Sequence, residues 1–79
     1  MPTFEGTFEI QDRTDAQAVR TLMEEAYNAF REELQVHGRM TEESSEVLQE
    51  FEVIRDATRR PAAGRLTIVY ERQDEPLDD

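Results

Sequence analysis

Two short segments near opposite ends of the chain alternate apolar and polar residues with a period of two. Within residues 3–10 the apolar positions are Phe4, Gly6, Phe8 and Ile10, and every intervening position is Thr or Glu. Within residues 65–72 the corresponding apolar positions are Leu66, Ile68 and Tyr70. This alternation is typical of a β-strand with one buried face. The sequence therefore predicts two strands, each with an apolar face that some other part of the fold must cover.

The region between the two strands has helical periodicity. A first helix is predicted from about Asp15 to Val36, with one apolar stripe formed by Val19, Leu22, Met23, Ala26, Phe30 and Leu34. Thr14 followed by Gln17 fits a capping box at its start, and Gly38 suits the left-handed position that ends a helix.

A second helix is predicted to start near Thr41. Its inner stripe consists of Val47, Leu48, Phe51, Ile54 and Thr58. Arg59 and Arg60 suit the negative end of this helix, and Pro61 cannot continue it. Because the link between the two helices is only about four residues, we expect them to form an antiparallel hairpin.

These elements predict a single α+β domain over residues 1–72, in the order β-α-α-β. The two strands should be antiparallel neighbours, with the helical hairpin covering one face of the two-stranded sheet. Residues 73–79 are polar, with Pro76 and three aspartates, and are predicted to be a flexible acidic tail.

A chain of 79 residues without cysteine has few means of stabilising a small core. Disulfides and thiolate metal sites are excluded, so association of two chains is the expected support. We predict a homodimer. It could extend the sheet edge to edge into four strands, or it could pack two sheets face to face through Val69 and the outer threonines.

The charge balance indicates adaptation to high salt, and a codon bias that favours arginine is the competing interpretation. Asp and Glu number 19, the net charge is −10, and all nine basic residues are arginine. Glu42, Glu46 and Glu50 would lie one above another on a helix, and Glu52 would lie above Asp56; such like-charged pairs repel unless salt screens them. In composition the chain resembles short proteins of the haloarchaeal type. The resemblance includes no family motif, so it implies no site residues.

Arg55, Arg59, Arg60 and Arg65 surround the predicted turn between the second helix and the second strand. Guanidinium groups match phosphate oxygens, so these four residues are the candidate anion site. The competing interpretation is that they cap the helix and pair with nearby acids, with Asp56 four residues before Arg60. A net charge of −10 also disfavours a nucleic acid partner.

No other constellation indicates catalysis or a bound cofactor. His37 is interpreted as a surface residue at a helix end, and Glu42, Glu43, Glu46 and Glu50 as a solvated acidic face rather than a metal site. Tyr27 and Tyr70 are interpreted as buried rings with satisfied hydroxyls. We therefore predict no catalytic residues, no metal and no cofactor.

The sequence favours an accessory or protein-interaction module that is not an enzyme and that can bind a further protein, partly through exposed strand edges. Two alternatives stay open: a nucleic-acid- or phosphate-associated protein that uses the arginine turn, and an enzyme subunit whose site is shared by two chains. No basic, apolar leader follows Met1 and the apolar runs are short, so we expect a cytoplasmic protein without a membrane span.

Overall fold

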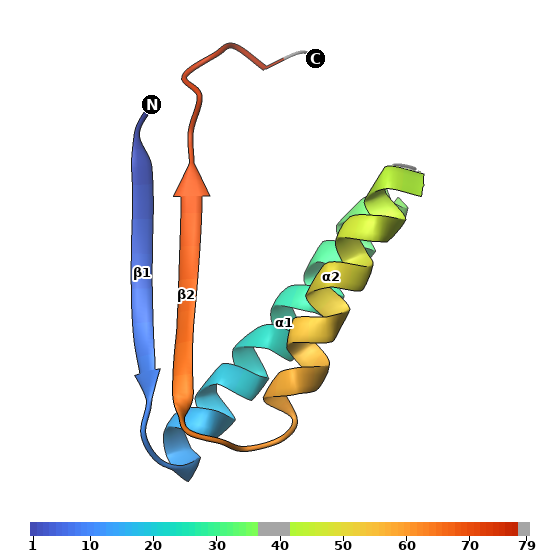
Figure 1. Cartoon of the computed structure of the whole chain (residues 1–79). Helices are drawn as coiled ribbons and strands as arrows, with labels where there is room; N and C mark the ends of the chain where they lie inside the picture. The colour runs from blue at the N-terminus through green and yellow to red at the C-terminus, as the bar shows by residue number, and fades with distance from the viewer. Residues whose placement is uncertain (37–41, 78–79) are drawn as a thin grey trace.

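The structure is a computed structural model that describes residues 1–36 and 42–77. It contains β1 (Thr3–Ile10), α1 (Arg13–Val36), α2 (Glu42–Thr58) and β2 (Gly64–Glu71), as Figure 1 shows. The predicted α+β class and the order β-α-α-β are confirmed. His37, Gly38 and Thr41 lie outside the described residues, and so do Asp78 and Asp79.

The two strands form an antiparallel pair in which Thr3 lies opposite Glu71 and Ile10 lies opposite Gly64. This register places the apolar positions of both strands on the same face of the sheet. We call this surface the apolar sheet face; it consists of Phe4, Phe8, Ile10, Leu66, Ile68 and Tyr70. The opposite face, here called the outer face, is polar: the hydroxyls of Thr7 and Thr67 lie 3.3 Å apart, and Arg65 Nε donates to Glu9 Oε1 at 2.8 Å.

The start of α1 differs from the prediction. The backbone N–H of Asp15 donates to Asp12 Oδ1 at 2.8 Å, and the N–H of Gln11 donates to Asp15 Oδ2 at 2.9 Å. Asp12 is therefore the capping residue, and Thr14 lies inside the first turn. The expected box of Thr14 and Gln17 is wrong because a carboxylate two residues earlier reaches the free amides first.

The core lies between the two helices. Its buried residues are Ala16, Val19, Met23 and Tyr27 of α1 and Leu48 of α2. Taking 100° per residue, the four residues of α1 lie on one side of the helix within about 80°. This side packs on α2, which confirms the antiparallel hairpin but accounts for only part of the predicted apolar stripe.

The helical hairpin meets the sheet at one end only. Both links between sheet and helices lie at the end formed by Ile10 and Gly64, and from there the strands and helices diverge, as Figure 1 shows. The radius of gyration is 14.8 Å, whereas a compact domain of this length has about 12 Å. The helices therefore cover one end of the apolar sheet face and leave the rest of it open.

Candidate interaction surface

The apolar sheet face is largely exposed. Phe4 and Tyr70 stack with their ring centroids 6.0 Å apart, yet their exposed fractions are 51% and 58%. Ile68, between them and the links, is 55% exposed. Only Ile10 and Leu66, near the helices, are half-buried. An apolar sheet face of this kind is normally covered by another part of a fold, so its exposure makes it the candidate interaction surface.

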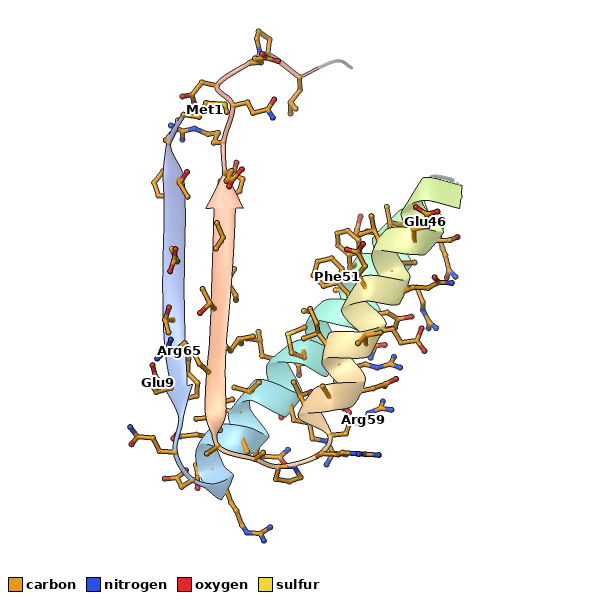
Figure 2. The ribbon with its side chains drawn as sticks, in the orientation of Figure 1. Met1, Glu9, Glu46, Phe51, Arg59 and Arg65 are labelled. Carbon is orange, nitrogen blue, oxygen red and sulfur yellow. The ribbon has the colours of Figure 1, made fainter. Side chains whose placement is uncertain are left out.

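The side of the helical hairpin that faces the sheet carries small and apolar residues, with Glu25 beside them. Ala18, Leu22 and Ala29 lie within about 40° of one another around α1, and this side is distinct from the one that packs on α2. All three are exposed. At the seam between the helices, the rings of Phe30 and Phe51 lie 5.5 Å apart. Figure 2 shows Phe51 projecting from the hairpin on the side of the strands.

These two apolar surfaces form the walls of an open space that we call the wedge. Near its closed end, Phe8 and Leu66 of the sheet and Ala18, Val19 and Leu22 of α1 line a groove of about 250 Å³. A second groove of about 400 Å³ extends under the end of α2, where its lining includes Val53, Ile54, Ala57 and Pro61. Both grooves are lined mainly by apolar side chains, so the wedge offers contact area but little polar chemistry.

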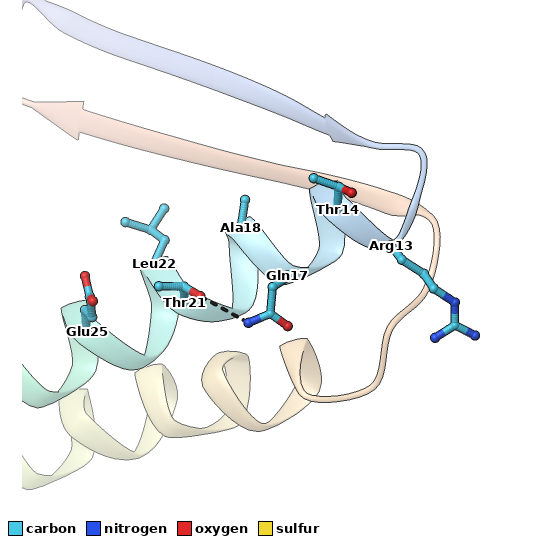
Figure 3. A pocket seen from close by; sticks show the side chains of 7 residues that line it. All are labelled: Arg13, Thr14, Gln17, Ala18, Thr21, Leu22 and Glu25. Carbon is cyan, nitrogen blue, oxygen red and sulfur yellow. Dashed lines mark hydrogen bonds between the residues drawn. The ribbon is translucent and has the colours of Figure 1, made fainter.

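A shallow hollow of about 750 Å³ runs along the flank of α1 beside the wedge. Figure 3 shows Thr14, Ala18 and Leu22 projecting from α1 toward the strands in this region. Gln17 Nε2 donates to Thr21 Oγ1 at 3.3 Å, so the two polar side chains satisfy each other. Arg13 and Glu25 line the hollow as well, so it continues the surface of Ala18 and Leu22 with a mixture of apolar, polar and charged side chains.

The structure arranges the four arginines of the candidate anion site in two pairs: Arg55 and Arg59 contact the same oxygen of Asp56, and Arg60 and Arg65 line one groove. Arg65 projects from β2 and is bound to Glu9, as Figure 2 shows. Arg60 lines the groove of about 400 Å³ and has no ion pair with the described part of the chain. Arg55 and Arg59 are both bound to carboxylates near the end of α2. The anion site stays a prediction, and three of its four residues already have anionic partners.

Arg55 is the most enclosed of these arginines. Its guanidinium lies over the ring of the buried Tyr27, 4.3 Å from the centroid. Its Nη2 donates to Asp56 Oδ1 at 3.1 Å and lies 3.6 Å from Glu52 Oε1. The hydrogen bond to Asp56 is the main cause that raises the pKa of Arg55 above its usual value. The expected repulsion between Glu52 and Asp56 is thus offset by a cation that contacts both.

Arg59 connects the two helices. Its Nε donates to Glu24 Oε1 of α1 at 3.0 Å, and its Nη1 donates to Asp56 Oδ1 at 3.3 Å. The hydrogen bond from Arg59 is the largest cause that lowers the pKa of Glu24, with a smaller contribution from Arg20. Asp56 pairs with Arg55 and Arg59 rather than with Arg60. Because α2 ends at Thr58, the chain does not keep the helical spacing that would bring Arg60 above Asp56.

The tyrosines divide between core and surface. Tyr27 is buried, as expected, but the expectation of a buried Tyr70 is wrong, because the helices have diverged from the sheet where Tyr70 stacks on Phe4. Glu46 and Glu50 lie exposed on α2. Within residues 1–36 and 42–77, no group of three or more His, Asp or Glu side chains is placed to hold a metal ion. His37 lies outside this part of the chain.

None of the described helices has the length and apolar character needed to cross a membrane. The chain matches no protein-family model, no curated protein and no solved structure. The fold and its exposed surfaces thus define the chain as a β-α-α-β domain of the α+β class with an open apolar wedge.

Proposed function

We propose that this chain is a small protein-interaction module that functions as a homodimer at high salt and has no catalytic chemistry of its own. The observation that carries the proposal is the exposed apolar sheet face, with Phe4, Ile68 and Tyr70 each more than half exposed. Large apolar side chains gathered on one regular surface are a feature of interfaces, because their contact with water is unfavourable.

Adaptation to high salt is supported by the composition and by the pairing of the arginines. The chain has ten more acidic than basic charges, so two chains that approach each other repel at low ionic strength. At ~1 M salt the Debye length is about 3 Å, which leaves only direct contacts such as those of Arg55 and Arg59. Arginine suits these contacts because its planar group binds carboxylates and is weakly hydrated.

Neither alternative function gains support from a particular observation. Arg55, Arg59 and Arg65 have carboxylate partners, so an approaching phosphate would compete with an existing ion pair. The grooves of the wedge are lined mainly by apolar side chains, together with Thr58, Arg60 and Arg65, and no carboxylate or imidazole among their lining residues offers a general acid or base. The interaction module is therefore the proposal that we carry forward.

Sedimentation equilibrium in molar KCl tests the proposal directly. We expect a particle of twice the chain mass of 9.2 kDa at micromolar concentration, dissociating on dilution. A particle of single chain mass throughout the micromolar range would refute the homodimer. Because the measurement needs no ligand, a negative result is informative.

A further inference from the structure

The amount of exposed surface indicates how large the missing contact is. The chain has an accessible surface of 6753 Å², whereas a compact monomer of its mass has about 4,900 Å². The excess is about 1,800 Å² per chain, part of it on the extended residues 73–77. A standard interface buries about 800 Å² per partner, and obligate dimers bury more. The excess is thus large enough for one interface of standard size.

Both walls of the wedge contribute exposed apolar side chains to this surface. One wall carries the stacked rings of Phe4 and Tyr70 at its open end, and the other carries the rings of Phe30 and Phe51. Phe4 and Tyr70 are 51% and 58% exposed, and Phe30 and Phe51 are 42% and 39% exposed. The guanidinium of Arg72 lies over the Phe4 ring at 5.6 Å. Each chain therefore presents two apolar surfaces, and in a dimer with twofold symmetry each surface can contact the other surface of the partner chain.

Charge also favours the wedge over the outer face as the meeting point. The apolar sheet face contains no charged residue, whereas the outer face carries Glu5, Glu9, Arg65 and Glu71. Two chains of net charge −10 that met through their outer faces would bring these carboxylates together and would have to desolvate them. Contact through the wedge leaves the carboxylates in water, where salt can screen them.

We infer that a second copy of this chain fills the wedge. In this dimer the open end of each apolar sheet face packs against the Phe30–Phe51 side of the other chain. The rings of Phe4 and Tyr70 in one chain then cover the rings of Phe30 and Phe51 in its partner. The inference rests on the proposed homodimer and names its site. It differs from both arrangements expected from the sequence, because neither the strand edges nor the outer face forms the main contact.

Two neighbouring residues of β2 provide a matched test. Ile68 lies on the apolar sheet face and is 55% exposed, while Val69 lies on the outer face and is 51% exposed. We expect Ile68→Asn to raise the Kd of the dimer about a hundredfold, because the residue is buried at two symmetric positions, each contributing roughly tenfold. Val69→Asn should leave the Kd within about threefold, since its side chain stays in water.

A spectroscopic reporter distinguishes dissociation from unfolding. The chain has no tryptophan, so Phe51→Trp introduces a single indole, which can be excited selectively above the absorption of the two tyrosines. We expect short-wavelength emission in the dimer and a red shift on dilution that follows the mass measured by sedimentation. Far-UV circular dichroism of the Ile68→Asn protein, recorded at the same concentrations, should stay helical while the mass halves.

The outcomes separate this inference from the proposal on which it rests. A wild-type chain that is monomeric would overturn both. If Ile68→Asn leaves a stable dimer intact and the indole of the Phe51→Trp dimer emits as an exposed ring, the wedge is not the interface. The homodimer itself would then still stand. A dimer that Val69→Asn dissociates instead would place the contact on the outer face.

Discussion

Replacing Asp12 by alanine tests the start of α1, where structure and sequence pattern disagree. Asp12 accepts the N–H of Asp15 at 2.8 Å, and no other side chain in the described part of the chain accepts that donor. Loss of an N-cap carboxylate typically costs about 1 kcal/mol, within a range of roughly 0.5–2. Thr14 makes no hydrogen bond through its hydroxyl within the described residues, so Thr14→Ala should cost less than about 0.5 kcal/mol.

For a domain of this size, 1 kcal/mol lowers the melting temperature by roughly 4–8 °C. Thermal unfolding followed by circular dichroism in molar KCl should therefore show a clear loss for Asp12→Ala and almost none for Thr14→Ala. Both variants must be measured at the same protein concentration, because dimerisation raises the apparent stability. If Thr14→Ala were the more damaging change, the hydroxyl would be the cap and the hydrogen bonding described for Asp12 would be wrong.

Two further predictions concern charge. The pKa of Glu24 is lowered from its ordinary value of 4.5 by Arg59, so the unfolded chain takes up this proton first as the pH falls, and the stabilisation present above the ordinary pKa is lost through the acid range. Glu24→Gln should lower the melting temperature at pH 7. The difference in melting temperature between this variant and the wild type should shrink below about pH 4.5. A difference that stays constant with pH would mean that the ion pair does not cause the stabilisation. Dialysis from molar KCl to about 10 mM salt lengthens the Debye length about tenfold, so carboxylates such as Glu46 and Glu50 are no longer screened from one another. The dimer should then dissociate and the helix content should fall. An unchanged mass and melting curve would contradict salt adaptation.

The strands are predictable from the sequence because their alternation has one interpretation. The pattern predicts a strand over residues 3–10 and β1 is Thr3–Ile10, while the second strand begins at Gly64, one residue earlier than predicted. The helix pattern is harder to interpret. Leu22 and Met23 fall in one predicted stripe, yet Met23 packs on α2 and Leu22 faces the wedge. A broad apolar stripe on α1 can contact both α2 and the sheet. The periodicity of the sequence does not show which residues of the stripe contact which neighbour.

The helix ends are less predictable than the helices themselves. Asp12 and Thr14 are both acceptable capping residues, and the choice depends on the path of the chain as it leaves β1. The partner of Asp56 depends in the same way on where α2 ends, since one residue decides whether Arg59 or Arg60 is within reach. Local sequence defines the possible partners, and the turn of the backbone selects among them.

The candidate site could not be predicted because it depends on the angle between the sheet and the helical hairpin, and neither sequence pattern contains that angle. Helices and sheet both form as their patterns dictate, and in a closed domain the apolar sheet face would pack on the helical hairpin. The hairpin instead uses the side with Val19 and Met23 for contact between its own helices, which leaves Leu22 as the largest side chain of α1 facing the sheet. Small residues such as Ala18 and Ala29 cannot fill a space that widens away from the links. A single chain therefore lacks the volume to close its own wedge, and the apolar walls are covered only if a further set of large side chains enters from outside.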